Sequence, residues 1–439
     1  MSRKGNRGNR VAAAALLALT AALALAAPAG AASISPNTFS DQDGTDPARC
    51  SLREAVTAAN DDAAFGGCPA GSGADQVPLR AGTYRVNLSA SNDIFVGSAS
   101  PISIFHRGAA PTVVDATGLG DQPFFTGDGV ITISGITIRG GTPSQNGGAI
   151  RNVSATLNLS GVTLTDNQST GFGGGITNFS NGTVNLTNVT ISGNSAVGSG
   201  GGISASNGTV TMSNVTITDN TADSDASGGG NGGGIHESSA TVTTRNTVIS
   251  GNRDLSGDGR AENCEGDYTT LGRTLIGTRA MFFSDCLWTV TPGNGDVFDA
   301  DVALLALAAN GGPTPTHALP AGSSALDIGG TCAATDQRGA PRSLGGPCDG
   351  GAYELVKCAG KVVNRVGTSG RDRLKGTKKA DGILGLAGRD VLRGLAGKDG
   401  LCGGKGRDKL FGGKGRDKLF GGKGRDKLRG GPGRDLQRQ

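Results

Sequence analysis

A row of aspartates near the C-terminus is the most regular chemical feature of the sequence. The aspartates follow one another at a strict spacing of nine residues: Asp372, Asp381, Asp390, Asp399, Asp408, Asp417, Asp426 and Asp435. A carboxylate supplies the hard, anionic oxygen that calcium prefers as a ligand. Glycines before the aspartates let the backbone turn, so that carbonyl oxygens can point towards the same place. The spacing therefore predicts a repeated site in which Ca²⁺ is the bound cofactor.

The elements that position these carboxylates are predicted from the residues beside them. An aliphatic residue lies two positions after each of the first seven aspartates: Leu374, Ile383, Leu392, Leu401, Leu410, Leu419 and Leu428. We expect these side chains to fill a narrow core, and two nonapeptides to make one turn of a parallel β-roll. A cation should then lie between aspartates 18 residues apart, such as Asp408 and Asp426. Lys379 replaces the expected glycine, which argues against a site at Asp381. The predicted metal ligands are Asp372, Asp390, Asp399, Asp408, Asp417, Asp426 and Asp435.

The best repeats of this segment carry a known signature. "GGKGRDKLF" begins at Gly403 and again at Gly412, and "GGKGRDKLR" follows from Gly421. Each matches GGxGxDxUx, where U is a large aliphatic residue, and resembles the RTX, or haemolysin-type, calcium-binding nonapeptide family. The resemblance implies a calcium-binding β-roll over residues 358–439.

The charge of the chain is divided between an acidic body and a basic tail. Residues 358–439 hold 22 Lys and Arg against 8 Asp, whereas residues 32–357 hold 15 Lys and Arg against 29 Asp and Glu. Such a surplus of positive charge attracts anionic polymers. Two interpretations of the tail therefore stay open: a calcium-binding roll, which the strict aspartate spacing favours, and a basic segment that binds a polyanion.

The body is also built from repeats. Five similar twelve-residue stretches begin at Val130, Thr156, Thr183, Thr209 and Thr241, at intervals of 26, 27, 26 and 32 residues. Alternating apolar residues in each stretch predict two short strands, and a Gly or Asn at the sixth position predicts a corner with a left-handed backbone. A third strand is predicted where "GGAI" or "GGGI" follows. The longer last interval comes from an insertion over residues 222–233, which should form a loop.

Three strands in about 26 residues describe one coil of a parallel β-helix, whereas a propeller blade needs four strands and about 40 residues. We therefore predict an all-β chain with a right-handed parallel β-helix over residues 101–300. Stacked coils would place Asn167, Asn194, Asn220 and Asn252 above one another as a hydrogen-bonded ladder.

Both ends of the body show further resemblances. "CSLREAVTAAN" from Cys50 predicts an amphipathic helix that covers the first coil, as an N-terminal cap over residues 32–100. This stretch, with "AGTYRV" from Ala81, resembles the CSLREA family of exported bacterial proteins. Residues 301–357 resemble the closing segment found in the same family. Together these resemblances imply a pectate-lyase-like β-helix, which does not fix a function.

The N-terminus and the cysteines indicate export. Residues 1–31 combine a basic start, an apolar stretch and small residues, which predicts a cleaved signal peptide and no membrane span after cleavage. Eight cysteines in an exported chain indicate disulfides, although they allow 105 connectivities. Pairing of sequence neighbours predicts four bridges: Cys50 to Cys68, Cys264 to Cys286, Cys332 to Cys348 and Cys358 to Cys402. A zinc site is not predicted, because no CxxC motif is present.

The body carries no recognisable catalytic motif. Glycoside hydrolysis needs paired carboxylates, but the only adjacent aspartates, Asp61 and Asp62, lie in the predicted cap. The three histidines are far apart in sequence: His106, His236 and His317. An acidic loop contains Asp254, Asp258, Glu262, Glu265 and Asp267, with Arg253 and Arg260 nearby, and is interpreted as solvated. Catalysis is disfavoured.

These observations predict a secreted or cell-surface calcium-binding, adhesin-like protein without catalytic activity. Its expected partners are calcium and a surface polysaccharide or other anionic polymer, and the chain is expected to be a monomer without a specific nucleic-acid partner. Two alternatives are a polysaccharide lyase or hydrolase on the β-helix, and a basic tail that tethers the body to an anionic cell-wall polymer.

Overall fold

The computed structural model describes residues 30–88, 93–257, 262–277, 287–289, 295–298, 300, 302–342 and 347–439. Within these ranges the chain forms 38 strands and one α-helix, which confirms the all-β prediction. The signal peptide predicted over residues 1–31 lies outside the described residues, except for its last two positions. No helix of the described chain is long and apolar enough to cross a membrane.

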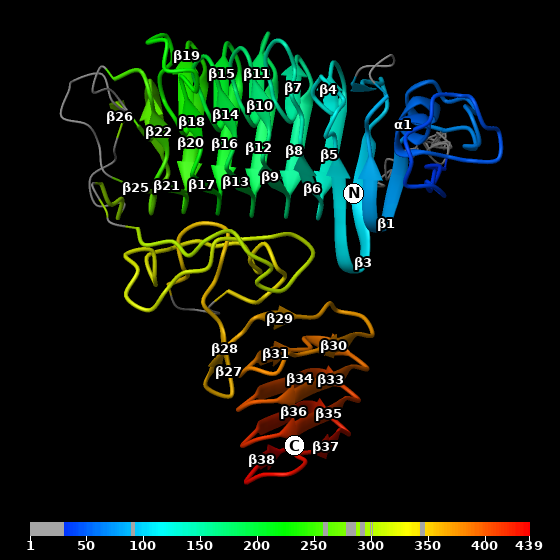
Figure 1. Ribbon diagram of the computed structural model, residues 1–439, viewed down its shortest axis with the longest axis vertical. Helices are drawn as coiled ribbons and strands as arrows, with labels where there is room; N and C mark the ends of the chain where they lie inside the picture. The colour runs from blue at the N-terminus through cyan, green and yellow to red at the C-terminus, as the bar shows by residue number, and fades with distance from the viewer. Residues whose placement is uncertain are drawn as a thin grey trace, which may run out of the picture.

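The body is a stack of coils whose strands pair in parallel ladders (Figure 1). The first ladder joins β5 (Val130–Ser134), β8 (Thr156–Ser160), β12 (Thr183–Thr187), β16 (Thr209–Ser213), β20 (Thr241–Arg245), β24 (Asp267–Thr270) and β26 (Leu287–Thr289). The second joins β6 (Thr137–Arg139), β9 (Thr163–Thr165), β13 (Thr190–Ser192), β17 (Thr216–Thr218), β21 (Val248–Ile249) and β25 (Leu275–Ile276). The third joins β2 (Ile94–Val96), β4 (Phe124–Thr126), β7 (Ile150–Val153), β11 (Ile176–Phe179), β15 (Ile203–Ser206), β19 (Ile235–Ser238) and β23 (Cys264–Glu265). Strand β3 (Ile102–Asp115) pairs with β5, with β6 and with β1 (Asp75–Arg85).

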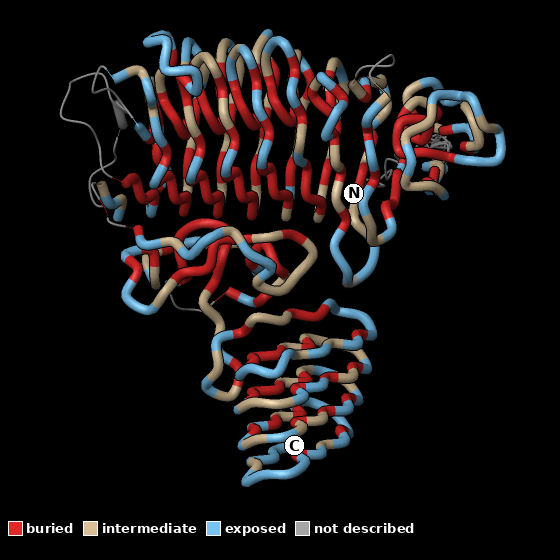
Figure 2. Tube along the Cα trace, viewed as in Figure 1, coloured by how far each residue is buried: buried red, intermediate tan, exposed pale blue. Residues whose placement is uncertain are grey.

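The predicted repeat register is confirmed. Thr183 pairs with Thr156 on one side and with Thr209 on the other, so equivalent residues of successive coils lie side by side. Alternate side chains such as Val184 and Leu186 are buried inside the stack, where Figure 2 shows a continuous buried interior. The sixth positions have a positive φ, 66° at Gly135 and between 52° and 64° at the next four, as the corner prediction requires. The right-handed winding stays a prediction.

A fourth ladder of two-residue strands was not expected from the sequence. It joins β10 (Gln168–Ser169), β14 (Ser195–Ala196), β18 (Thr221–Ala222) and β22 (Arg253–Asp254). These strands are too short to show an alternating pattern of apolar residues, which is why the sequence gives no signal for them. Four successive coils therefore have four strand positions each instead of the three that were predicted.

The predicted asparagine ladder is confirmed and is longer than expected. The Nδ2 groups of Asn167, Asn194 and Asn220 each donate to the Oδ1 atom of the next asparagine at 2.9 Å. Asn252 continues the ladder to Asn263 at 3.1 Å. All five side chains are buried, so the ladder satisfies polar groups that water cannot reach.

The predicted N-terminal helix is α1 (Leu52–Asn60), which packs against β1 and β2 at the N-terminal end of the stack. Ser51 and Glu54 form a capping box: the Ser51 side chain accepts from the Glu54 N–H, and the Glu54 side chain accepts from the Ser51 N–H. This arrangement satisfies two helix-terminal donors and fixes where the helix begins.

The segment from residue 302 to residue 356 lies along the flank of the coils (Figure 1). Gln337 donates to Thr163 Oγ1 at 2.7 Å and accepts from Thr190 Oγ1 at 2.6 Å, which places it across two adjacent coils. Further along, the Gly351 N–H donates to the Asn246 carbonyl oxygen. The residues predicted as a closing segment therefore contact the side of the stack over several coils.

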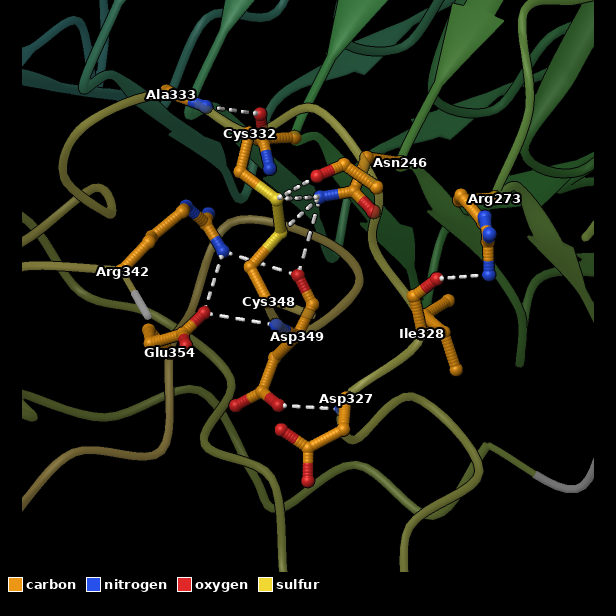
Figure 3. The surroundings of a disulfide bond; sticks show 12 residues. Asn246, Arg273, Asp327, Ile328, Cys332, Ala333, Arg342, Cys348, Asp349 and Glu354 are labelled. Atoms are coloured by element: carbon orange, nitrogen blue, oxygen red, sulfur yellow. Dashed lines mark hydrogen bonds and ion pairs between the residues drawn. A yellow bond between two sulfur atoms is a disulfide. The ribbon is translucent and has the colours of Figure 1, made fainter. Parts of the chain in front are cut away.

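Three of the four predicted disulfides are confirmed: Cys50–Cys68, Cys332–Cys348 and Cys358–Cys402. The fourth was predicted between Cys264 and Cys286, and Cys286 lies outside the described residues. Figure 3 shows that Asn246, at a coil corner, reaches the Cys332–Cys348 bridge; its Nδ2 lies 3.1 Å from the Cys348 sulfur. This bridge therefore helps to fasten the flanking segment to the stack.

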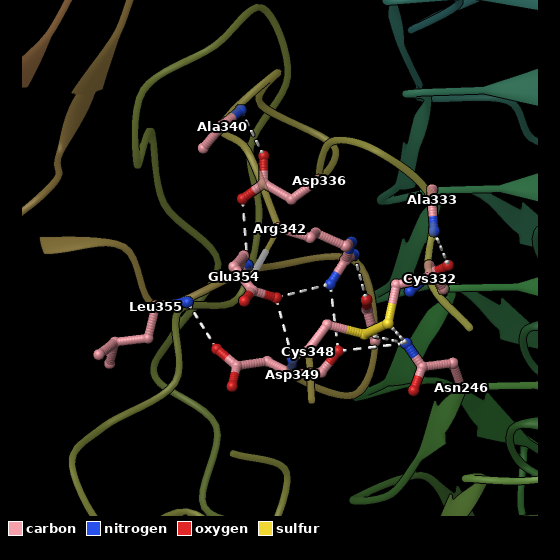
Figure 4. Close-up of polar contacts among 12 residues, drawn as sticks. Asn246, Cys332, Ala333, Asp336, Ala340, Arg342, Cys348, Asp349, Glu354 and Leu355 are labelled. Atoms are coloured by element: carbon pink, nitrogen blue, oxygen red, sulfur yellow. Dashed lines mark hydrogen bonds and ion pairs between the residues drawn. A yellow bond between two sulfur atoms is a disulfide. The ribbon is translucent and has the colours of Figure 1, made fainter. Parts of the chain in front are cut away.

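A buried ion-pair network orders the flanking segment (Figure 4). Arg342 lies 3.1 Å from the Glu354 carboxylate, and its other nitrogen donates to the Asn188 side chain on a coil corner. Arg338 pairs with Asp336 at 2.8 Å and is buried as well. Because each charge has a partner and further hydrogen bonds, the network can persist away from water.

The chain then enters the C-terminal repeats, and we call residues 365–438 the nonapeptide unit. One parallel sheet joins β29 (Arg365–Val366), β31 (Gly382–Leu384), β34 (Gly400–Gly406), β36 (Lys418–Gly424) and β38 (Leu436–Arg438), with β32 (Ala387–Gly388) beside β34. The other joins β30 (Arg373–Lys375), β33 (Val391–Ala396), β35 (Lys409–Lys414) and β37 (Lys427–Arg429). A hairpin of β27 (Lys357–Cys358) and β28 (Lys361–Val362) precedes the unit and is joined to it by the Cys358–Cys402 disulfide.

Candidate calcium site

The nonapeptide unit pairs residues that are 18 positions apart. Leu392 pairs with Leu410 in one sheet, and Leu401 pairs with Leu419 in the other. The predicted aliphatic positions form a single buried core between the two sheets: Ile383, Leu392, Leu401, Leu410 and Leu419 are fully buried, with Leu374 and Leu428 partly buried against them. Each turn thus consists of two nonapeptides, as the sequence predicted.

This register stacks the aspartates into two columns. One column holds Asp372, Asp390, Asp408 and Asp426, and the other holds Asp381, Asp399, Asp417 and Asp435. Within a column, each aspartate N–H donates to the Oδ1 atom of the aspartate 18 residues later, at 2.9 to 3.0 Å. The backbone therefore fixes one carboxylate oxygen of every aspartate except the first of each column.

The hydrogen bonding of the second carboxylate oxygen, Oδ2, differs between the first two repeats and the later ones. Oδ2 is buried and has no hydrogen-bond partner within the described chain in five aspartates: Asp390, Asp399, Asp408, Asp417 and Asp426. A buried carboxylate oxygen without a partner is energetically costly. A cation beside it would remove that cost, so the five oxygens fit a cation that binds hard oxygen ligands.

Two threonines satisfy the corresponding oxygen in the first two repeats. Thr368 donates to Asp372 Oδ2 from its backbone N–H at 2.6 Å and from its hydroxyl at 3.0 Å. Thr377 makes the same two hydrogen bonds to Asp381. Asp372, a predicted ligand, therefore has the same threonine contacts as Asp381, which was not predicted as a ligand. The threonine at the second position of these two repeats is the sequence signal that distinguishes Asp372 and Asp381 from the other aspartates.

Gly403 and Gly406 show why glycine recurs at the first and fourth positions of the nonapeptide. A Cβ atom on Gly403, the first position, would lie 2.5 Å from Asp408 Oδ2. Gly406, the fourth position, has a φ of 140°, and a Cβ atom there would lie 1.6 Å from the Gly388 carbonyl oxygen. The chain therefore approaches both the carboxylate and the neighbouring turn more closely than any other residue allows.

Burial changes the acidity of the aspartate columns. It raises the pKa of Asp390 and of Asp399 to about 6. For Asp390, the hydrogen bond from the Asp372 N–H opposes this effect, and the charges of Asp408 and Asp372 add to it. Burial also raises the pKa of Asp408 and Asp417. Without a cation, the columns therefore resist carrying their full negative charge.

These pKa shifts predict that the calcium-free unit becomes less stable between pH 5 and pH 7.5. A carboxyl group whose pKa is raised on folding contributes stability that is present below its unfolded value, near 4, and is lost as the pH rises through about 6. Thermal unfolding in EDTA, followed by circular dichroism, should show the tail transition at a lower temperature at pH 7.5. Saturating calcium should reverse the order, because protons then compete with the metal.

The Asp390→Asn/Asp399→Asn double variant is the control for this pH dependence. Its tail transition in EDTA should change less than that of the wild type over the same pH range, because the amides do not titrate and only Asp408 and Asp417 keep a raised pKa. A wild-type transition that is equally stable at both pH values in EDTA would contradict the assignment of the raised pKa values to these two carboxylates.

No group of three or more His, Cys, Asp or Glu side chains in the described ranges is arranged to share a metal ion. Within a column, a carboxylate has another carboxylate beside it only on the adjacent turns. An ion bound there would take its remaining ligands from backbone carbonyl oxygens and water, which calcium accepts and which suits its six to eight oxygen ligands.

The other candidate residues do not converge. His106 contacts Thr112 and Gly108, His317 lies between Ser192 and Leu305, and His236 lies 3.6 Å from the Glu265 carboxylate. Burial lowers the pKa of all three histidines. Two residues of the predicted acidic loop, Asp258 and Arg260, lie outside the described residues. The adjacent pair Asp61 and Asp62 directly follows helix α1.

The columns, the glycine turns and the single aliphatic core define the class of this segment: a parallel β structure built from calcium-type nonapeptides. The model of the RTX calcium-binding nonapeptide repeat matches this segment in four copies, over residues 366–401 and 403–436. No curated protein and no solved structure matches the chain. The resemblances to the CSLREA family and to pectate-lyase-like proteins stay predictions.

Proposed function

We propose that this protein is secreted or surface-associated, binds calcium through its C-terminal β-roll and acts as an adhesin-like molecule without catalysis. The observation that carries the proposal is the set of five buried Oδ2 atoms without a partner, in a segment with RTX repeats. The disulfides support an extracellular location. The proposed ligands are Asp390, Asp399, Asp408, Asp417 and Asp426, and Asp435 extends its column at the exposed end.

The body would serve as a long, rigid display surface. Helix α1 would cap its first coil, and the flanking segment would brace its side. The separation of His106, His236 and His317 onto different elements supports a role without catalysis. The partner of the coils would be a surface polysaccharide, and a monomer would suffice for this role.

The calcium ligands can be tested by titration of matched aspartate variants. Asp408→Asn and Asp426→Asn each remove one charge at a position where Oδ2 has no partner, and we expect calcium affinity to fall about tenfold or more. Asp372→Asn removes the same charge where Thr368 already bonds the carboxylate, and should change affinity by about twofold or less. Isothermal titration of the full-length protein with calcium, and with magnesium as a control, measures both.

Equal losses in Asp372→Asn and Asp408→Asn would contradict the assignment of the ligands. Absence of any calcium-specific heat in the wild-type protein would contradict the proposed function itself.

A further inference from the structure

We propose that the protein has an anion site beside the second aspartate column, and that the site binds the phosphate groups of a phosphodiester polymer. A cavity of about 450 Å³ lies where the β27–β28 hairpin meets the edge of the sheet that contains β34 and β36. The residues that line it include five basic side chains and two carboxylates: Lys361, Lys398, Arg416, Lys418, Arg434, Asp399 and Asp417. The lining therefore has a surplus of three positive charges.

The repeat register produces this concentration of charge. Lys398, Arg416 and Arg434 each precede an aspartate and are 18 residues apart, so they come from successive turns. Adjacent parallel strands lie about 4.8 Å apart, and the three basic residues therefore stack as a column along the edge. Lys361 reaches the same cavity from the hairpin, which the Cys358–Cys402 disulfide holds in place.

The basic side chains of this cavity form no salt bridge within the described chain. The acidic groups beside them are Asp417 and Asp399, and the charge of Lys361 opposes the rise in the pKa of Asp399. None of the salt bridges in the described chain includes a Lys or Arg of residues 347–439, a stretch that the structure describes completely. Lys398, Arg416 and Arg434 are exposed, so a ligand can reach them from solvent. Like charges stacked this closely repel one another, and an anion would relieve that repulsion.

The chemistry of the lining suits phosphate. Two of the five basic residues are arginines, whose planar guanidinium groups match the oxygens of a phosphate with two parallel hydrogen bonds. The lysines add point charges to the same space. A polymer fits better than an isolated ion, because the basic column continues over three successive turns along the open edge.

Calcium would strengthen this site, a step that rests on the proposed function. Asp399 and Asp417 line the cavity and are also proposed calcium ligands. A divalent ion on this column would neutralise the two carboxylates that oppose an anion. The protein would then hold a phosphodiester polymer more tightly when calcium is present, and the RTX repeats would form the attachment site to that polymer.

The opposite edge of the unit supplies a matched control. Arg407 and Arg425 occupy the same repeat position as Arg416 and Arg434, and are also exposed, but they belong to the other column and do not line the cavity. The double variants Arg416→Gln/Arg434→Gln and Arg407→Gln/Arg425→Gln therefore remove equal charge from two edges of one fold.

The test is fluorescence anisotropy of a labelled poly(glycerol phosphate) oligomer with the full-length protein, at fixed ionic strength and saturating calcium. We expect Arg416→Gln/Arg434→Gln to weaken binding about tenfold or more, and the control pair to weaken it about twofold through long-range charge alone. Circular dichroism of each variant confirms that the repeats remain folded. Equal losses in both pairs, no binding by the wild type, or tighter binding of polygalacturonate than of the phosphodiester would overturn the proposal.

The same experiment separates this proposal from calcium binding. If titration shows calcium binding but the oligomer does not bind, the anion site is wrong and the calcium function stands. If the oligomer binds with the expected difference between the two variants, yet calcium produces no heat and no structural change, the anion site stands and the calcium function is wrong.

Discussion

Removal of calcium from the intact protein is expected to make the nonapeptide unit a rapid substrate for trypsin, while the coils stay resistant. The segment of residues 358–439 has 22 Lys and Arg, so trypsin has a possible cleavage site in nearly every repeat. Its core is a single row of aliphatic side chains, and five carboxylate oxygens lack partners when no cation is present. Such a segment should be only marginally stable without metal, and should open often enough for trypsin to cleave it.

The protection should appear at a calcium concentration of about 10⁻⁴ to 10⁻³ M, the range of many extracellular modules. One turn, residues 403–420, carries six basic residues around Asp408 and Asp417. A unit charge about 10 Å from a divalent ion costs about 0.8 kcal/mol in water, and salt reduces this cost. Several such charges together lower the affinity by one or more factors of ten, because each 1.4 kcal/mol changes it tenfold.

The measurement is the rate at which intact tail disappears during digestion at a series of free calcium concentrations. We expect cleavage to slow by about a hundredfold or more at saturation, since cleavage requires local unfolding. Magnesium at the same concentrations should protect far less, because it rarely gives up its water for a protein cage. Equal cleavage in EDTA and in 10 mM calcium, about ten times the upper limit of that range, would rule out calcium-dependent folding and favour the basic, polyanion-binding tail.

Much of the coil architecture could be predicted because it repeats. The interval of 26 or 27 residues fixed the register of β8, β12 and β16, and the Gly or Asn at the sixth position fixed the corners. The same regularity predicted four members of the asparagine ladder. Asn263 was missed because it lies only 11 residues after Asn252, outside the repeat interval, yet accepts its hydrogen bond.

Contacts between distant segments could not be predicted. Gln337 bonds to Thr163, 174 residues earlier, and no periodic pattern links those positions. The position of the flanking segment depends on such single contacts and on buried pairs such as Arg342 with Glu354. Their geometry is set by tertiary packing, whereas the sequence pattern reports only local periodicity.

The outline of the candidate site could be predicted from the repeat, but the difference between the first two aspartates and the later ones could not. The nine-residue spacing placed the aspartates in columns with an 18-residue register. It did not distinguish Asp372 from Asp390, because both occupy the same repeat position. Asp372 differs from Asp390 because two donors of Thr368 bond to the Asp372 carboxylate. The nine-residue spacing of the aspartates says nothing about which side chain lies at the position of Thr368.

Replacement of Asn220 by alanine is expected to destabilise the coils strongly. Asn220 is fully buried, and its Nδ2 group donates to Asn252 Oδ1, to the Ile191 carbonyl and to the Thr218 carbonyl. Its Oδ1 atom accepts from both the N–H and the side chain of Asn194. Alanine would leave several of these buried groups without a partner, each at a cost of about 1–3 kcal/mol.

We therefore expect Asn220→Ala to lower the free energy of unfolding by about 3–5 kcal/mol. Asn185→Ala is the matched control: Asn185 is only partly buried and donates one hydrogen bond, to Asn158 at 3.0 Å. Its loss should cost about 0.5–1.5 kcal/mol. Urea unfolding in saturating calcium, followed by circular dichroism, measures both variants under conditions in which the nonapeptide unit stays folded.

Asn220→Asp separates the loss of hydrogen bonds from the loss of volume. Aspartate has nearly the same shape as asparagine, but at neutral pH it would place a carboxylate oxygen against three buried acceptors: Asn252 Oδ1 and the two carbonyl oxygens. It should therefore destabilise the coils at least as much as alanine does, although it leaves no cavity. A stability close to that of the wild type for Asn220→Asp would show that the ladder contributes packing and little hydrogen-bond energy, because only the donor would have been removed.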